Sequence, residues 1–187
     1  MGKKILCINP GSTSTRIAVF EDREKQFVTT LTHSNEELEK FGDVQGQLQY
    51  RYEAIAQVLK DNGIDAAAMD AIVGRGGALR PMAGGILAVN EQMLEDCRTA
   101  RYAEHPSNLG CQLAKMFADP HGLPCYVVDP PLVDEFAEES KYSGFAPLRR
   151  ISAFHALNEK IVARYVAEEL GKPLEQVNII TTHLGSG

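Results

Sequence analysis

The feature that most constrains the fold is a pair of short apolar strands joined by a small polar turn near the N-terminus. Residues 5–8 (Ile-Leu-Cys-Ile) and 17–20 (Ile-Ala-Val-Phe) are apolar, and residues 9–16 between them read Asn-Pro-Gly-Ser-Thr-Ser-Thr-Arg. Gly11 lets the backbone approach a ligand, the hydroxyl and N–H groups are donors, and Arg16 adds a positive charge. Because a strand follows the turn and no Gly-Lys-Ser/Thr ending is present, the pattern is not a Walker loop. It indicates an anion site, although a plain tight β-hairpin would use the same residue types.

A second glycine-rich turn lies at the other end of the chain. Residues 177–182 (Val-Asn-Ile-Ile-Thr-Thr) read as a buried strand, and residues 183–187 (His-Leu-Gly-Ser-Gly) follow directly. A strand edge and a phosphate-type loop with nothing after them would leave that edge unpaired. We therefore expect the chain to be the front part of a longer protein.

Composition is that of an ordinary soluble globular domain, with 187 residues, 44% of them hydrophobic and 24% charged. The net charge of −6 argues against a nucleic-acid or anionic-membrane partner, because no basic stripe is available to neutralise phosphates. No apolar run has transmembrane or signal-peptide length, so we predict a cytoplasmic protein. The cysteines form no Cys-x-x-Cys motif, which favours buried, reduced thiols over disulfides or a structural metal.

Periodicity in the rest of the chain predicts alternating helices and strands. A third strand at residues 26–31 would complete a meander of three antiparallel strands. Helices are predicted at 48–62, 91–102 with the cap Asn90, 109–117 and 156–170, and further strands at 71–73, 124–128 and 177–182. The last helix carries an apolar face formed by Leu157, Ile161, Val162, Tyr165 and Val166.

This order of elements, and several short motifs, resemble a known family. Three antiparallel strands followed by helix, strand, helix, strand are similar to the ribonuclease-H-like half domain of actin and the sugar kinases. The turn at 9–16 resembles the opening signature of the acetate and butyrate kinase family, and Pro10 with the Thr13/Thr15 spacing resembles its butyrate branch. Further segments in the family's order are 73–77 (Val-Gly-Arg-Gly-Gly), 105–110 (His-Pro-Ser-Asn-Leu-Gly), 128–130 (Val-Asp-Pro), 154–155 (Phe-His) and 183–187.

The resemblance implies an α/β protein with a ribonuclease-H-like, actin-like ATPase domain. Its mixed sheet would hold three antiparallel strands and then parallel strands, with helices on both faces. Residues 1–154 would form the first domain, on the acyl and phosphate side. Residues 155–187 would supply a connecting helix, a first strand and a phosphate loop of a second, incomplete domain. The match covers the whole chain and about the first half of the expected enzyme, which we expect to be a homo-oligomer at full length.

The activity implied is phosphoryl transfer from ATP to butanoate or a branched relative, giving ADP and an acyl phosphate, with Mg²⁺ as cofactor. A carboxylate is already a nucleophile, so catalysis reduces to alignment and to neutralising charge on the phosphoryl group. Arg75, between glycines at a strand end, suits that task, although a surface loop arginine is the plain alternative. By the resemblance, His155 is the transition-state histidine, and Asp129 orients Arg75 or Asn9 or holds Mg²⁺ through water. Arg75, His155 and Asp129 are the predicted catalytic residues.

The remaining predicted site residues follow the same resemblance. His105 and Phe154 are assigned to the acyl substrate, and Asn9 and Asp129 to the metal. The residues assigned to phosphate or nucleotide are Asn9, Ser12, Ser14, Arg16, His183, Gly185 and Gly187. His33 and His121 have no motif around them and are predicted to be solvated loop residues.

Three alternatives stay open at this stage. The acid could be acetate or propionate, because a pocket discriminates a methylene by only about 1–3 kcal/mol. The chain could be a non-enzymatic actin-like nucleotide binder, since fold alone does not fix chemistry. It could also be an inactive fragment that exposes an apolar patch, because the family's adenine pocket, another arginine and a magnesium-directing glutamate lie beyond residue 187.

Overall fold

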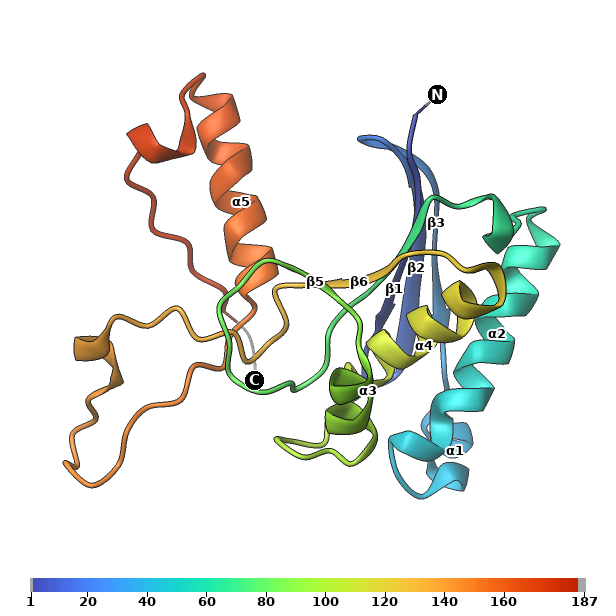
Figure 1. Ribbon diagram of the computed structural model, residues 1–187, viewed down its shortest axis with the longest axis horizontal. Helices are drawn as coiled ribbons and strands as arrows, with labels where there is room; N and C mark the ends of the chain where they lie inside the picture. The colour runs from blue at the N-terminus through green and yellow to red at the C-terminus, as the bar shows by residue number, and fades with distance from the viewer. Residues whose placement is uncertain (1, 185–187) are drawn as a thin grey trace. The chain divides into compact units, whose positions relative to one another are not determined.

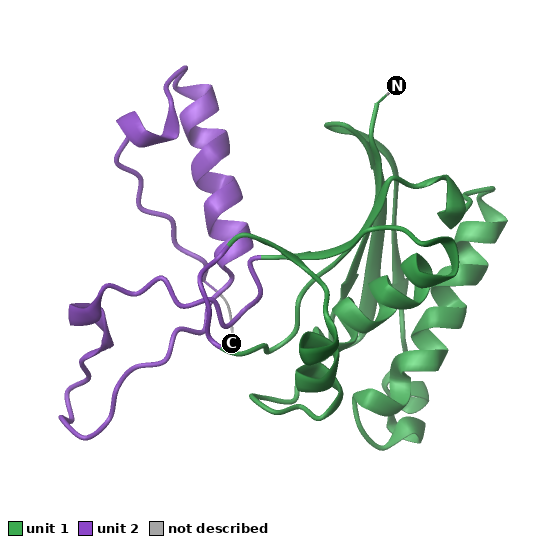
Figure 2. Cartoon of the chain, in the orientation of Figure 1, with its two compact units in different colours: residues 1–80, 85–128 green, residues 81–84, 129–187 purple. Residues whose placement is uncertain are grey.

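The computed structural model describes residues 2–184 and separates into two compact units (Figure 2). Unit 1 comprises residues 1–80 and 85–128, and unit 2 comprises residues 81–84 and 129–187. Each unit is described by itself below. The predicted domain boundary after residue 154 remains a prediction.

Unit 1 is built on a mixed sheet of six strands in the order β3-β2-β1-β4-β6-β5 (Figure 1). Neighbouring strands β1, β2 and β3 run antiparallel, β4 and β6 continue parallel to β1, and β5 is antiparallel to β6. The strands are β1 Lys4–Pro10, β2 Ser14–Glu21, β3 Glu24–Thr32, β4 Ala71–Gly74, β5 Ile86–Ala88 and β6 Cys125–Val128. The predicted meander and the parallel strands after it are confirmed, whereas the short edge strand β5 was not foreseen.

Alternation of side chains explains why the N-terminal residues form strands. In β1, Leu6 and Ile8 are fully buried while Cys7 between them is only half-buried, and in β2 Ile17 and Val19 repeat the pattern. This two-residue period places one apolar row on the core face of each strand. The paired register of Leu6 with Val19 and Ile8 with Ile17 brings the two rows side by side.

The helices of unit 1 cover the core face of the sheet. Leu109, Leu113 and Ile55 are fully buried against the β1 and β2 rows and form one hydrophobic core with them. The helices are α1 Asn35–Leu38, α2 Leu48–Asp61, α3 Glu91–Arg98, α4 Asn108–Ala118 and, in unit 2, α5 Ala156–Glu169. Short 3-10 turns lie at Glu39–Phe41, Gln45–Gln47, Ala66–Ala68, Asp119–His121, Glu138–Lys141 and Leu174–Gln176. The sequence predicts helices on both faces of the sheet, and the helices of unit 1 cover one of these faces.

Two glycines allow α4 to approach β4 closely. A methyl group on Gly110 would overlap the carbonyl oxygen of Arg75, and one on Gly74 would overlap the carbonyl oxygen of Gly110. No side chain fits where two backbones meet at this distance. The glycines of the 73–77 and 105–110 motifs therefore bring the start of α4 against the end of β4.

Two details of the predicted elements are wrong. Helix α3 is capped by Asn90 as predicted, but it ends at Arg98 because Ala100 takes a left-handed φ of 48°. Residues 177–182 form no strand among the residues described, and Ile180 is 93% exposed, because no described strand lies alongside to pair with them. Helix α5 forms as predicted, and Leu157, Val162 and Tyr165 of its apolar face are exposed.

The four cysteines are free thiols, and Cys97, Cys111 and Cys125 are buried. The sulfur atoms of Cys97 and Cys111 lie 3.3 Å apart, although the residues are on different helices. Burial raises the pKa of the Cys125 thiol to about 11, which keeps it protonated. No helix among residues 2–184 is long and apolar enough to cross a membrane.

Candidate phosphate and acyl site

The polar turn lies between β1 and β2, as the sequence predicts. The N–H of Gly11 donates to the carbonyl oxygen of Ser14 at 2.7 Å, closing the turn, and Ser12 is exposed at its tip. Asn9 and Arg16 are paired across the two strands and are both exposed. Residues directly opposite in a ladder share one face, so the amide and the guanidinium stand side by side there.

A residue that sequence reasoning missed supports this turn from within the protein. Arg51 of α2 is fully buried, and its guanidinium donates to the carbonyl oxygens of Gly11 and Ser12 at 2.9 Å and of Ser14 at 3.0 Å. A signal was available, because Arg51 lies four residues before Ile55 on the apolar stripe of the helix. A charge on such a stripe needs a specific partner.

His33 was predicted to be a solvated loop residue, and that prediction is wrong: His33 is 3% exposed. Its Nε2 lies 2.9 Å from the Thr15 hydroxyl, and its Nδ1 lies 3.2 Å from the Tyr50 hydroxyl. Tyr50 donates to Glu37, so the Tyr50 oxygen accepts from Nδ1–H and Thr15 donates to Nε2. Burial, and secondarily the charge of Arg51, lower the pKa of His33 and favour this neutral form. His121 is exposed, as predicted.

Arg75 follows β4 at the same edge of the sheet as the turn. Strands β1 and β4 are parallel, with Ile8 opposite Gly74, and the N–H of Arg75 donates to the carbonyl oxygen of Ile8 at 2.9 Å. Arg75 therefore stands beside the end of β1, where Asn9 begins the turn. Burial lowers the pKa of its half-buried guanidinium, which stays protonated because arginine ionises far above neutral pH.

The start of α4 holds the loop that carries Arg75. The Asn108 side chain accepts from the N–H of Ala78 and donates to the carbonyl oxygen of Ala103, both at 2.8 Å. His105 lies in the same segment, and its Nδ1 accepts from the N–H of Ser107 at 3.1 Å. The neutral imidazole therefore carries its proton on Nε2. Within unit 1, the structure brings the 105–110 motif against the Arg75 loop.

Unit 2 holds Asp129, which follows β6 directly. Its backbone has a left-handed φ of 40°, and its side chain accepts from Lys160 of α5 at 3.0 Å. Lys160 also pairs with Glu135 at 2.6 Å, and the two carboxylates raise its pKa against the opposing effect of burial. Sequence reasoning missed Lys160, because the helical pattern gives no hint of a partner 31 residues away.

Unit 2 also brings together two of the predicted histidines. Nδ1 of His155, at the start of α5, lies 3.1 Å from Nε2 of His183, and the two rings meet edge to face. Asn158 accepts from Nδ1 of His183 at 3.1 Å, so in the neutral state His155 donates to His183. The N–H of Phe154 donates to the carbonyl oxygen of Pro131. Gly185 and Gly187 lie outside the described residues.

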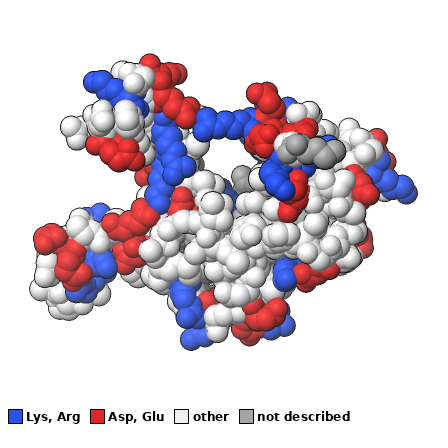
Figure 3. All heavy atoms as spheres, turned by 45° about the horizontal axis from the view of Figure 1, so that its top comes forward, with Lys and Arg blue, Asp and Glu red and all other residues white. Residues whose placement is uncertain are grey.

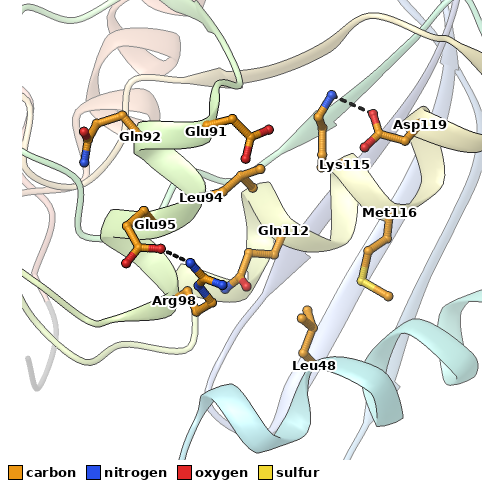
Figure 4. A pocket seen from close by; sticks show the side chains of 10 residues that line it. All are labelled: Leu48, Glu91, Gln92, Leu94, Glu95, Arg98, Gln112, Lys115, Met116 and Asp119. Carbon is orange, nitrogen blue, oxygen red and sulfur yellow. Dashed lines mark hydrogen bonds and ion pairs between the residues drawn. The ribbon is translucent and has the colours of Figure 1, made fainter.

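A groove of about 560 Å³ lies elsewhere in unit 1, among α2, α3 and α4 (Figure 4). Its charged side chains include two ion pairs, Arg98 with Glu95 and Lys115 with Asp119. None of the predicted site residues lines it. The predicted site residues therefore lie outside this groove.

Charges of both signs are mixed over the face of the described residues shown in Figure 3. Lys and Arg side chains lie among Asp and Glu, in keeping with a net charge of −6. That face therefore shows no broad basic surface.

Comparison with known sequences identifies the relatives of this chain. Butyrate kinase 1 of Clostridium acetobutylicum is 46% identical over 184 residues, which are 98% of this chain and 52% of that protein. A probable butyrate kinase of Listeria monocytogenes is 45% identical over 187 residues, 100% of this chain and 53% of that protein. The chain is homologous to the N-terminal half of the butyrate kinases. It spans about half the length of these curated butyrate kinases, and no family model matches it.

Solved structures agree on the fold. The crystal structure of Porphyromonas gingivalis acetate kinase matches with a TM-score of 0.61 at 16% identity, covering 93% of this chain and 50% of that protein. Identity this low carries the fold alone. The predicted actin-like ATPase fold and the predicted relationship to butyrate kinases are both confirmed.

Proposed function

We propose that this chain supplies the acyl and phosphate side of a butyrate kinase, which transfers the γ-phosphoryl group of ATP to butanoate or a branched short-chain relative. The observation that carries the proposal is 45–46% identity to butyrate kinases over essentially the whole chain. The placement of Arg75 beside the polar turn, at the ends of two adjacent parallel strands, supports it. Ligand sites of open α/β sheets lie at such strand ends.

In the proposed reaction, a carboxylate oxygen of the acid attacks the γ-phosphorus. A new O–P bond forms between the carboxylate oxygen and the γ-phosphorus, the bond from phosphorus to the β–γ bridging oxygen breaks, and ADP leaves with that electron pair. No proton has to be removed from the nucleophile. Arg75 would present its guanidinium to the carboxylate or the equatorial oxygens. Asn9, Ser12, Ser14 and Arg16 would bind phosphate, and His105 would border the acyl group.

In unit 2, His155 would stabilise the charge on the transferring phosphoryl group, His183 would bind phosphate and Phe154 would line the acyl pocket. Among the described residues, no group of three or more His, Cys, Asp and Glu forms a metal cage. Mg²⁺ bound with substrate phosphates needs only one or two protein oxygens. The proposed donors are the Asn9 amide in unit 1 and the Asp129 carboxylate in unit 2. Mg²⁺ would supply charge neutralisation on the nucleotide. The Lys160 ammonium group already pairs with the Asp129 carboxylate, so Lys160 and Mg²⁺ would have to share that carboxylate.

The test is an acyl-phosphate assay with hydroxylamine trapping, using ATP, Mg²⁺ and acetate, propionate, butyrate or isobutyrate. It is run on the 187-residue chain and on a protein extended to the length of the curated relatives. We expect product in the extended protein, with the greatest turnover on butyrate or isobutyrate. Preference for acetate would move the assignment to the acetate branch. Absence of product with every acid would favour the alternative of an actin-like nucleotide-binding protein.

A cytoplasmic location and a homo-oligomeric full-length protein complete the proposal. The second rests on apolar side chains such as Leu157 and Tyr165 of α5, which the described residues leave exposed. Analytical ultracentrifugation of the extended protein tests it. A single monomeric species across a tenfold range of concentration would contradict it.

A further inference from the structure

The polar turn is held from its inner side by one buried cation. Within the described structure, the six hydrogen bonds of the Arg51 guanidinium end on neutral oxygens: the carbonyls of Gly11, Ser12 and Ser14, the Thr15 hydroxyl, and the Gln47 amide oxygen, which accepts two. The distances run from 2.9 to 3.1 Å. The remaining carbonyl of the turn, that of Thr13, accepts from the N–H of His33 at 2.8 Å. The carbonyls at 11–14 therefore all have donors within the protein.

The direction of these carbonyls fixes the direction of the neighbouring N–H groups. The peptide bonds described are trans, and in a planar trans peptide the C=O of one residue and the N–H of the next point opposite ways. Because the carbonyls of Gly11 and Ser12 point at Arg51, the N–H groups of Ser12 and Thr13 point away from it. Ser12 and Thr13 are exposed, so these two donors face the outer side of the turn.

The charge of Arg51 acts in the same sense. Burying a guanidinium is costly, and burial lowers the pKa of Arg51, although arginine remains protonated at neutral pH. Each N–H group of the guanidinium has an acceptor, but none of these acceptors carries a negative charge. An anion on the outer side of the turn would supply that charge through a thin layer of backbone, where screening by water is weak.

From this geometry we infer that Arg51 is a positioning residue for phosphate binding: it turns the carbonyls of residues 11–14 inward, aims the N–H groups of Ser12 and Thr13 outward, and adds an uncompensated positive charge behind them. The inference rests on the proposed function for the identity of the substrate. It does not make Arg51 a catalytic residue, because its side chain is buried and touches only the protein.

Two variants of the extended protein separate positioning from folding. Arg51→Gln removes both the charge and the fork that holds three carbonyls. Gln47→Glu is nearly isosteric, keeps both hydrogen bonds to Arg51, and neutralises its charge with a buried ion pair. Ile55→Ala, one turn along α2, is the matched control, because it opens a core cavity without touching the turn.

We expect Arg51→Gln to raise KM for ATP on the order of 100-fold, the effect of misplacing a site by about an ångström. Gln47→Glu should raise KM for ATP about tenfold with its melting temperature unchanged or higher. KM for the acid should change less than about twofold in both variants, and Ile55→Ala should lower the melting temperature with KM for ATP unchanged. If Gln47→Glu, and Arg51→Gln where it folds, keep KM for ATP within about twofold of the parent, the inference is overturned.

Binding of inorganic tripolyphosphate by calorimetry keeps the two proposals distinguishable. If the parent protein makes no acyl phosphate with any acid, the proposed function fails, and the Arg51 inference is then judged on tripolyphosphate alone. Weaker binding by about tenfold in Gln47→Glu supports it. Equal binding in the parent and in both variants refutes it.

Discussion

At the residue scale, two cations near the polar turn have different proposed roles. Arg75 stands at the end of β4 with a half-buried guanidinium, whereas Arg51 is sealed behind the turn. A group that must reach a substrate needs some exposure, and a group that only orients backbone does not. The strand-end position of Arg75 is readable from its flanking glycines, while the position of Arg51 is readable only as an anomaly on an apolar stripe.

Replacing Arg75 by alanine in the extended protein should lower turnover on the order of 100-fold or more. The reason is that the negative charge building on the phosphoryl oxygens would lose a preorganised positive group that stabilises it. Arg75→Lys should recover only part of the rate, since an ammonium cannot present a planar fork. Steady-state acyl-phosphate formation measures both. Arg101→Ala, at an exposed position, is the control, and near-normal turnover in Arg75→Ala would remove Arg75 from the mechanism.

The buried His33 should make the stability of the chain depend on pH. Its pKa is lowered in the folded state, so the unfolded chain binds the proton more readily. The contribution of neutral His33 to the free energy of unfolding should therefore be fully present above the ordinary histidine pKa of about 6.5. It should be lost as the pH drops below that value. Protonation would also turn Nε2 into a donor against Thr15, beside the charge of Arg51, with only Tyr50 and Glu37 on the other side.

Urea unfolding at pH 7.5 and pH 5.5 measures this effect. The difference in free energy between the two pH values should shrink in His33→Gln, which does not titrate. His121→Gln, at an exposed position, should keep the difference of the parent chain. An identical pH dependence in His33→Gln and the parent would assign it to other groups.

At the scale of elements, the close contact of α4 with β4 positions the Arg75 loop. It depends on Gly74 and Gly110, whose backbones meet without side chains between them. Within the motif at 105–110 the resemblance assigns a role only to His105, at the acyl site, whereas the contacts give Gly110 and Asn108 a structural task. Helical periodicity predicted α4 to within a residue at each end, because its apolar positions repeat cleanly. It could not predict which face of the loop α4 would support.

Gly110→Ala should destabilise unit 1, because the new methyl group overlaps the backbone of Arg75 and one element must move. Overpacking of this kind costs about 1–3 kcal/mol. The midpoint of urea unfolding at unchanged slope measures the loss. Gly144→Ala is the control, because a methyl group there meets nothing within 4 Å. Equal midpoints in the two variants would show that α4 can withdraw from β4 at no cost.

At the scale of the whole molecule, order is uneven along the chain. Unit 1 has a closed core between the sheet and its helices, whereas residues 177–182 of unit 2 are without strand partners among the described residues. Side chains such as Ile180 are then apolar surface in water. A strand forms only when a neighbour accepts its hydrogen bonds, whatever its own sequence favours.

Hydrogen exchange of the 187-residue chain should show this contrast. Amides of β1 should be protected to the level of global unfolding, because they are bonded on both sides, to β2 and β4. Amides of residues 177–182 should exchange close to the unprotected rate. Slow exchange in that segment, measured by mass spectrometry at micromolar concentration, would show that it pairs with another copy of the chain or with an element of unit 1.

The sequence by itself determined the order and type of the main elements, the polar turn between the first two strands and the relationship to the butyrate kinases. These rest on local patterns: a two-residue period in β1 and β2, a helical period in α2 and α4, and short motifs in a fixed order. Only the tertiary structure decided that His33 is buried, that Arg51 holds the turn and that residues 177–182 have no strand partner among the residues described. Burial and pairing depend on what another part of the chain brings to the same place, and no local pattern records that.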